Sequence, residues 1–424
     1  MMKICFFTKY PPIEGGVASQ SYWLAKALGE QGMEVHIITD ALEEGLHRED
    51  INFEDVDDLT NYQPLNVFVH SLDEIHSFSL SDRRSLVTKQ SSAWRLASFG
   101  IDIIKRHECD LINSHYLLPY GVAGYLAKII TGRPLILRHA GSDISAVSSY
   151  ESFHLIFQEI FNKADCILTH KTRIAFFNRL KISREKLFFG FSHGIDSKYF
   201  NPQVPAMDLN KYGLKIDAGL PIITYIGKIG RPKGIHELVE AASQIKEDFL
   251  LLFVTGGPGL EQFKEYIKIF PSLKNKHHFL GFIPPWKIPS VLKSSRCLTQ
   301  LERDFPIEHH FPVQPMEALA VGTCLMVSEE IYEKYKNLEG IEKEKNVLAV
   351  NPKNTKELKN LLEKVIKNKK LAEDIGKEGA KIFKPEVFSN SISATIELYA
   401  SLIKKGKSLK ACLEELQETI LRYL

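Results

Sequence analysis

The order of segments along the chain is the feature that most constrains its fold. Residues 3–8 form an apolar run of strand length, residues 9–16 have the composition of a turn, and residues 17–32 show helical spacing of apolar side chains. The run EVHIIT at residues 34–39 then predicts a second strand. A strand, a glycine-bearing turn, a helix and a strand in this order predict a βαβ unit, from which parallel sheets are built.

The same alternation continues and then starts again in the second half of the chain. Residues 196–220 form a polar segment with two prolines, Pro202 and Pro205, so they are the best candidate for a domain boundary. Strands are predicted before this boundary at 109–114, 134–139 and 165–170, and after it within 221–230, 249–259, 277–283, 296–301 and 323–328, with helices from 353 to 424.

We therefore predict an α/β protein with two Rossmann-like domains, residues 1–205 and 206–424, each with a doubly wound parallel sheet. Whether the last helices pack back on the first domain is left open. Because parallel sheets bind ligands beyond the carboxyl ends of their strands, we expect the ligand in a cleft between the two domains.

Composition excludes several classes of protein. Of the 424 residues, 44% are hydrophobic and 25% charged, as in soluble globular proteins. A net charge of +2 does not suggest a nucleic-acid partner. No apolar run approaches the roughly 18 residues of a spanning helix, and no cleavable signal is evident, so we expect a cytoplasmic protein. Single, scattered cysteines predict buried thiols rather than a zinc site or disulfides: Cys5, Cys109, Cys166, Cys297, Cys324 and Cys412.

Two glycine-bearing turns are candidate anion sites. Gly15 and Gly16 stand before the first helix, where the backbone can approach a ligand closely and free N–H groups can meet an anion. The segment 227–234 (GKIGRPKG) carries Lys228, Arg231 and Lys233 before a helix, which suits a pyrophosphate. The alternatives are a tight turn without a ligand and a solvated basic loop.

A third candidate is the segment 308–322. Pro315 fits the first turn of a helix that ends near Gly322, and Glu317 then lies near the start of that helix. A carboxylate accepts hydrogen bonds from both hydroxyls of a ribose, so Glu317 is a candidate ribose ligand. The alternative is an acidic residue that complements the helix dipole.

Taken together, these motifs resemble the group 1, family 4-like retaining glycosyltransferases of the GT-B fold. The resemblance covers nearly the whole chain: the opening KICFFTKYPPIEGGVASQSYWLAKALGEQGMEV, then FSHGIDSKYFNP, GKIGRPKGIHELVEA and PMEALAVGTCLMVS. It implies that the second domain binds a nucleotide-diphosphate sugar as donor. The first domain would then bind the acceptor, a sugar, a lipid-linked hydroxyl or a small molecule.

The resemblance also implies roles for single residues. The donor pyrophosphate is expected to bind Lys228 and Lys233; the family usually has arginine at the position of Lys228. Glu317 is expected to bind the ribose. His139, in the segment RHAGSDI, is expected near the transferred sugar. The remaining candidates at the donor site are Gly15, Gly16, Gly227, Arg231, Gly257, His309, Phe311, Pro312 and Val313, and on the acceptor side His115 and Asp143.

One position departs from the family pattern. Glu317 matches the second glutamate of an E-x7-E signature, but His309 stands where the first glutamate belongs. Glu308 could substitute after a shift of one residue, or His309 could bond the sugar or a phosphate. The sequence leaves both possibilities open.

Neither a metal nor a cofactor is expected. Asp55 and Asp57 fit a D-x-D pattern, but they lie in an acidic stretch without a neighbouring strand or phosphate loop, so we interpret the pattern as chance. Lysines and a helix dipole would then replace the metal in catalysis.

The segment 83–106 is basic and contains Trp94. A basic amphipathic helix with a tryptophan could touch the inner membrane face, although an ordinary solvated helix face is the favoured interpretation.

The sequence thus predicts a metal-independent hexosyltransferase. The alternatives are a sugar phosphorylase or epimerase on the same fold, and a non-catalytic relative that binds nucleotide sugars.

Overall fold

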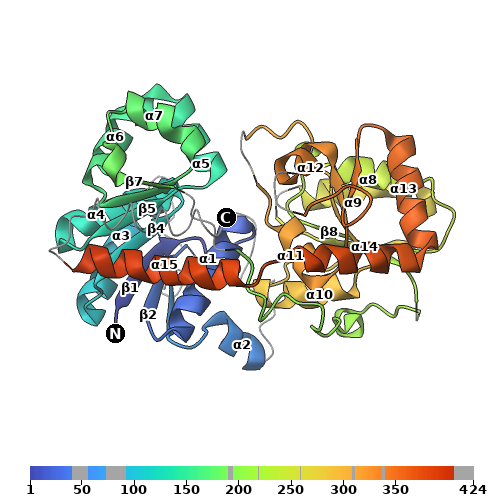
Figure 1. Cartoon of the computed structure of the whole chain (residues 1–424), viewed down its shortest axis with the longest axis horizontal. Helices are drawn as coiled ribbons and strands as arrows, with labels where there is room; N and C mark the ends of the chain where they lie inside the picture. The colour runs from blue at the N-terminus through green and yellow to red at the C-terminus, as the bar shows by residue number, and fades with distance from the viewer. Residues whose placement is uncertain are drawn as a thin grey trace, which may run out of the picture.

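The chain folds into two α/β domains, each built on a parallel sheet (Figure 1). The computed structural model describes residues 1–40, 56–72, 92–189, 194–217, 219–257, 259–307, 311–336 and 340–404. Two parallel-sheet domains were predicted from the sequence, and this prediction is confirmed.

The first domain has a seven-stranded sheet in the order β3-β2-β1-β4-β5-β6-β7, with all neighbouring strands parallel. The strands are β1 (Lys3–Thr8), β2 (Glu34–Thr39), β3 (Val67–Ser71), β4 (Leu111–His115), β5 (Leu135–Arg138), β6 (Cys166–Thr169) and β7 (Leu187–Phe189). The α-helices are α1 (Gly16–Glu30), α2 (Val56–Tyr62), α3 (Ser92–His107), α4 (Val122–Thr131), α5 (Gly141–Ser149), α6 (His154–Lys163) and α7 (Ile174–Arg179).

The second domain has a six-stranded parallel sheet in the order β10-β9-β8-β11-β12-β13. Its strands are β8 (Ile222–Ile226), β9 (Leu250–Val254), β10 (His277–Phe279), β11 (Cys297–Gln300), β12 (Cys324–Ser328) and β13 (Leu348–Val350). The α-helices that follow β8 are α8 (Ile235–Ala242), α9 (Leu260–Lys268), α10 (Ile288–Ser294), α11 (Gln314–Val321), α12 (Glu329–Tyr335), α13 (Thr355–Lys367), α14 (Lys369–Lys381) and α15 (Glu386–Ile403).

Burial on both faces explains why the central strands are apolar throughout. Successive side chains of a strand point to opposite faces, and a parallel sheet is covered on both. In β1, Ile4 and Phe6 pack into a core shared by the two domains, whereas Cys5 and Phe7 pack under α3 and α4. Strands that are short or half-exposed escaped prediction: β3, whose Phe68 is exposed, and the three-residue strands β7 and β13.

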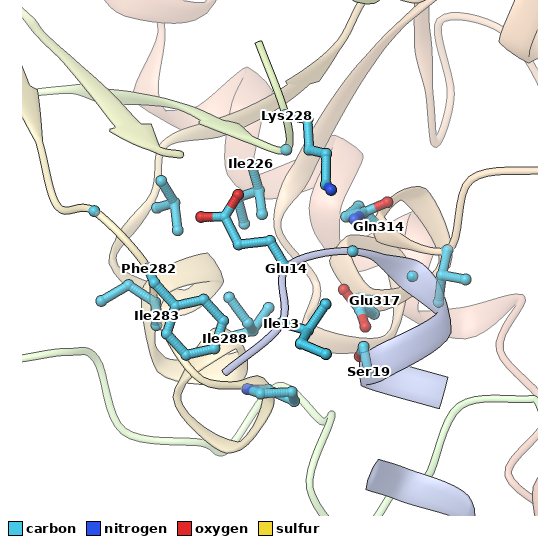
Figure 2. Close-up of a pocket in the computed structure, with 17 residues that line it drawn as sticks. Ile13, Glu14, Ser19, Ile226, Lys228, Phe282, Ile283, Ile288, Gln314 and Glu317 are labelled. Atoms are coloured by element: carbon cyan, nitrogen blue, oxygen red, sulfur yellow. The ribbon is translucent and has the colours of Figure 1, made fainter. Parts of the chain in front are cut away.

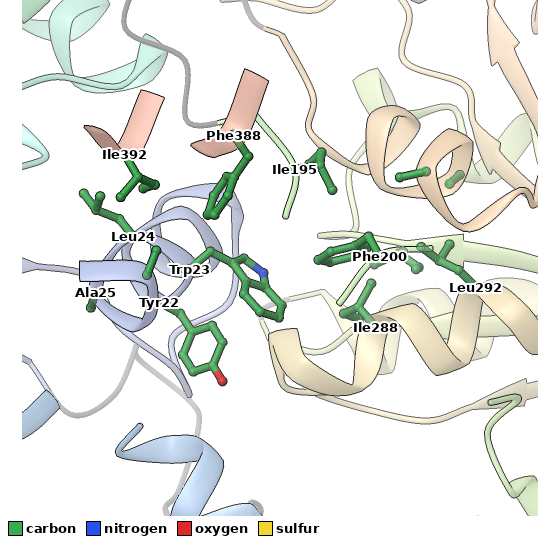
Figure 3. Close-up of a cluster of buried hydrophobic side chains, with 14 of the residues drawn as sticks. Tyr22, Trp23, Leu24, Ala25, Ile195, Phe200, Ile288, Leu292, Phe388 and Ile392 are labelled. Atoms are coloured by element: carbon green, nitrogen blue, oxygen red, sulfur yellow. The ribbon is translucent and has the colours of Figure 1, made fainter. Parts of the chain in front are cut away.

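The last described helix, α15, returns to the first domain. Figure 1 shows it running beside α1, and its Tyr399 hydroxyl accepts a hydrogen bond from the Asn113 side chain on β4. The side chains of Phe388 and Ile392 on α15 join the same core as Tyr22 and Trp23 on α1 (Figure 3).

That shared core continues into the second domain. The Tyr22 ring lies 5.1 Å from that of Trp286, which precedes α10 in the second domain, and the Trp23 ring lies 5.2 Å from that of Phe200, in the segment that leads to this domain. The buried carboxylate of Asp58 on α2 accepts hydrogen bonds from Trp286 Nε1 at 3.2 Å and Lys287 Nζ at 2.6 Å. These contacts hold the two domains in one relative position around the pocket described below.

Further predictions concern the cysteines, membrane-spanning helices, the D-x-D pattern and the basic segment. Cys5, Cys109, Cys166, Cys297 and Cys324 are buried free thiols, as predicted, and Cys412 lies outside the described residues. Among the residues that the structure describes, no helix has the length and apolar character needed to cross a bilayer. Asp55 and residues 83–91 of the basic segment also lie outside the described residues.

Candidate functional site

A pocket lies between the two domains, beyond the carboxyl ends of their sheets (Figure 2). Its empty volume is about 680 Å³, including space open to solvent. Its lining comes from the turn after β1 and the start of α1, the turns after β8, β9 and β10, and the start of α11: Ile13, Glu14, Gly15, Gly16, Ser19, Ile226, Gly227, Lys228, Val254, Gly281, Phe282, Ile283, Pro285, Ile288, Val313, Gln314 and Glu317.

The turn before α1 brings backbone to the pocket, as predicted for Gly15 and Gly16. Gly15 has a φ of 124°, a conformation that favours glycine, and α1 begins at Gly16 with no acidic residue in its first turn. A Cβ on Gly15 would lie 3.8 Å from Cε of Lys228, an ordinary van der Waals distance, so this turn lies directly against the loop after β8. The start of a helix of 15 residues therefore faces the pocket with its positive dipole end.

Lys228 is the exposed cation of the pocket. The Tyr225 hydroxyl donates a hydrogen bond of 2.7 Å to the Lys228 carbonyl, and Gly227 has a φ of 145° that turns the chain sharply after β8. Figure 2 shows the Lys228 ammonium directed toward Gln314 and Glu317. The loop therefore presents a positive charge beside the α1 N-terminus.

Lys233 and Arg231 occupy other positions in the same loop. The Lys233 ammonium forms an ion pair with Glu302, whose side chain is 1% exposed, and lies 4.2 Å from the centre of the Phe305 ring. Neither Lys233 nor Arg231, which is exposed, belongs to the pocket lining. Of the three predicted cations, the structure thus places only Lys228 at the pocket surface.

Glu317 lies in the first turn of α11, as predicted, and α11 ends at Gly322 in the left-handed conformation. Its side chain is buried, and burial raises the pKa of the carboxyl to about 7. The same side chain also lines a smaller neighbouring pocket with Ser19, Trp23 and Asp196. Burial shields the Glu317 carboxyl from water. Hydroxyl groups of a ligand would therefore donate the hydrogen bonds that water does not.

The segment before α11 is anchored by Tyr335. Its hydroxyl donates a hydrogen bond to the Pro312 carbonyl, and its ring stacks on Phe311 with ring centres 4.2 Å apart. Val313 lines the pocket, whereas Phe311 and Pro312 do not. The predicted residues His309 and Glu308 lie outside the described residues.

The opposite end of the pocket is apolar. Val254 at the end of β9, Phe282 and Ile283 after β10, and Ile288 at the start of α10 meet there. Figure 2 shows Phe282, Ile283 and Ile288 grouped away from Lys228 and Glu317. The pocket therefore joins an apolar end to an end that carries a cation, a helix N-terminus and a carboxyl.

Glu14 was missed by sequence analysis, although it directly precedes the two glycines. It belongs to the first domain, but its carboxylate lies against the glycine turn of the second: a Cβ on Gly256 would lie 2.6 Å from its Oε1, and one on Gly257 3.8 Å from its Oε2. Gly257, a predicted ligand contact, therefore faces Glu14. In Figure 2 the carboxylate of Glu14 lies between the apolar side chains and Lys228.

His139 directly follows β5 and is not among the residues that line the pocket. Its Nδ1 donates to the Ala140 carbonyl at 2.9 Å, and its Nε2 lies 2.7 Å from the Thr169 hydroxyl. Burial lowers the pKa of His139 to about 4, so the ring is neutral at pH 7. A Cβ on the nearby Gly141 would lie 2.8 Å from Cγ2 of Ile307 in the second domain, which places this loop on the wall of the cleft.

The two acceptor-side candidates have internal partners. Asp143 is buried and accepts hydrogen bonds of 2.7 Å from the N–H groups of Leu117 and Ile144. Burial raises its pKa to about 6. His115 is also buried, with Nδ1 3.4 Å from the Ser21 hydroxyl, and burial lowers its pKa well below the ordinary value. Both residues support the loops after β4 and β5 from within the domain, and neither lines the pocket.

Comparison with known proteins shows a similarity between the second domain and a known family. Residues 208–382 match the sequence model of the family described as glycosyl transferases group 1. N-acetyl-alpha-D-glucosaminyl L-malate synthase of Bacillus anthracis is 23% identical over 274 residues, 64% of either chain, so the match spans less than two thirds of that relative's length.

Solved structures resemble both domains together. Sucrose-phosphate synthase from Thermosynechococcus elongatus has a TM-score of 0.62 at 18% identity, over 95% of this chain and 99% of that one. The Anabaena protein Alr3699/HepE in complex with UDP and glucose has a TM-score of 0.60 at 16% identity, over 93% and 99%. The arrangement of the two domains is the GT-B fold that the sequence motifs implied.

Proposed function

We propose that this chain is a retaining, metal-independent glycosyltransferase that moves a sugar from a nucleotide-diphosphate sugar to a hydroxyl acceptor. One observation carries the proposal: Lys228, the N-terminus of α1 and Glu317 converge on one pocket between two parallel-sheet domains. The Anabaena protein, which shares the fold, is described in complex with UDP and glucose, which supports a nucleotide donor.

The two ends of the pocket suit the two ends of such a donor. A nucleobase fits the apolar end near Phe282 and Ile283, while the buried carboxyl of Glu317 accepts hydrogen bonds from the ribose hydroxyls. The pyrophosphate then meets Lys228 and the α1 N-terminus, which stabilise the negative charge that grows as the sugar leaves. The Lys233–Glu302 pair holds the loop beneath the phosphates.

The acceptor, a sugar, a lipid-linked hydroxyl or a small molecule, enters from the first domain, where the His139 loop forms the wall. In the proposed front-face substitution, the departing diphosphate takes the proton of the acceptor hydroxyl, so no carboxylate nucleophile is needed and the anomeric configuration is kept. The protein would act in the cytoplasm, with at most a weak membrane contact near Trp94, which is 67% exposed.

Calorimetric titration with UDP, GDP, ADP and dTDP tests the donor site. One of them is expected to bind the wild type, and a Glu317→Gln, Lys228→Ala double variant is expected to lose this binding. With the corresponding nucleotide sugar, release of the diphosphate only in the presence of an acceptor excludes a phosphorylase or an epimerase. If none of the four binds folded wild-type protein, the proposal fails.

Glu14→Gln is expected to tighten binding of that diphosphate about fivefold. The change removes a negative charge beside the phosphates, worth about 1 kcal/mol at a separation of 4 Å in water. Glu261→Gln is the matched control, because its side chain is exposed on α9 and changes the net charge equally without lining the pocket. Equal binding by the Glu14 variant would show that this charge does not lie beside the phosphates, and weaker binding would show that the carboxylate contacts the ligand favourably.

A further inference from the structure

A cluster of histidines lies in the first domain at the end of β2 that is remote from the pocket. Glu34 and His36 are the first and third residues of β2, so their side chains share one face of the strand. His70 comes from the neighbouring β3, and His107 ends α3. Three separate elements therefore bring imidazole and carboxylate groups to one point.

His36 is the centre of this cluster, and its side chain is only 1% exposed. Its Nε2 lies 2.9 Å from Glu34 Oε1, its Nδ1 lies 3.0 Å from His70 Nε2, and its ring centre lies 4.2 Å from that of His107. One ligand atom each from Glu34, His36 and His107 lie within 4.8 Å of one another.

We propose that Glu34, His36 and His107 bind a divalent transition-metal ion of the zinc class. Two imidazole nitrogens and one carboxylate oxygen match the preferences of Zn²⁺, whereas Mg²⁺ and Ca²⁺ prefer oxygen ligands alone. In a tetrahedral zinc site with bonds of about 2.0–2.1 Å, ligand atoms are about 3.3 Å apart. Since the three atoms lie within 4.8 Å of one another, each distance has to shorten by at most about 1.5 Å.

The hydrogen bonds around His36 favour this binding. A metal ion takes the place of the proton between His36 Nε2 and Glu34 Oε1. The Nδ1–H of His36 then donates to His70 Nε2, as the second nitrogen of a metal-binding histidine usually donates to a neighbouring acceptor.

Lys3 would compete with a metal ion for the Glu34 carboxylate. Its Nζ lies 3.5 Å from Glu34 Oε1, and its side chain is 33% exposed. A divalent ion with two nitrogen ligands binds more strongly than one ammonium, and Lys3 can turn toward solvent. Metal binding would then join the start of β2 to the end of α3, far from the nucleotide pocket. The expected effect is on the stability of the first domain rather than on sugar transfer.

The test uses the full-length chain, free of any histidine tag and stripped with a chelator. Calorimetric titration with ZnCl₂ is expected to show one ion bound with a Kd of about 1 μM or tighter, and Zn²⁺ is expected to raise Tm where Mg²⁺ does not. Glu34→Gln and His107→Ala are each expected to weaken Zn²⁺ binding at least tenfold. The matched control is His278→Ala, which removes a histidine of the second domain and should bind Zn²⁺ like the wild type.

Circular dichroism confirms that each variant is folded before titration. Glu34→Gln keeps the shape of the side chain, so it remains informative if His107→Ala does not fold. Wild-type protein that binds no Zn²⁺, or a folded Glu34→Gln variant that binds it as tightly as the wild type, overturns the proposal. Both outcomes are independent of nucleotide binding.

Discussion

Lys228→Ala is expected to lower kcat about 10²- to 10³-fold while leaving Tm unchanged. Lys228 is the exposed cation in the pocket lining, and removal of one group that stabilises developing charge typically has an effect of this size. Its side chain is not buried, so truncation leaves no cavity. Steady-state kinetics with the nucleotide sugar selected in the titrations, together with thermal unfolding, measure both quantities.

The matched control is Lys246→Ala, which removes an exposed lysine of the same domain that does not line the pocket. It should retain wild-type kinetics. If Lys228→Ala also retains them, this residue does not contact the leaving group and the proposed arrangement of the donor is wrong.

Lys233→Ala is expected to lower stability as well as activity. This change removes the ion pair that Lys233 forms with the buried Glu302, and breaking a buried pair typically destabilises a protein by about 3 kcal/mol. Activity and stability should therefore fall together in Lys233→Ala, and Glu302→Gln added to it should restore much of the stability. In Lys228→Ala only activity should fall.

Local signals in the sequence were sufficient to predict most of the strands and helices of the fold. Apolar runs such as residues 3–8 and 222–226, each followed by glycine and then a helix, identify parallel strands because these are buried on both faces. The same turns also located Gly15, Lys228 and Glu317, because in this architecture loops at the carboxyl ends of strands converge. These residues were predicted from their place after a strand or at a helix start.

The remaining features depend on contacts between distant segments. Glu302 shows its importance only through its pairing with Lys233, and Glu14 only through its approach to Gly256 in the other domain. The grouping of Glu34 and His36 with His107 depends on the end of α3 reaching β2. Such contacts leave no periodicity or motif in the sequence, so sequence analysis that considered only cysteine-based zinc patterns could not detect a histidine cluster.

Glu317→Gln is expected to make the protein more stable and to lower its affinity for a nucleotide sugar. Burial raises the pKa of this carboxyl from 4.5 to about 7 in the folded protein. Between these values the folded chain keeps a proton that the unfolded chain has lost, so stability decreases as pH rises through this window. The full penalty above pH 7 is ~3 kcal/mol, at about 1.4 kcal/mol per pKa unit.

Glutamine cannot ionise, so the variant escapes this penalty. At about pH 8 it should unfold at higher denaturant concentration than the wild type, by up to ~3 kcal/mol in free energy, whereas near pH 5 the two should be similar. Chemical denaturation at both pH values measures the difference. A variant no more stable than the wild type at pH 8 would mean that the carboxyl ionises in the folded state without cost.

The same carboxyl links pH to ligand affinity. If the ionised form accepts the ribose hydroxyls, wild-type affinity for a nucleotide sugar should rise about tenfold between pH 6 and 8, as the ionised fraction rises around a pKa of about 7. A nucleotide sugar is the right probe, because both of its phosphates are esterified and neither titrates in this range. Glu317→Gln should bind it more weakly and with a flat pH profile. A variant that keeps the rise would assign the pH dependence to another group and remove Glu317 from the proposed ribose contact.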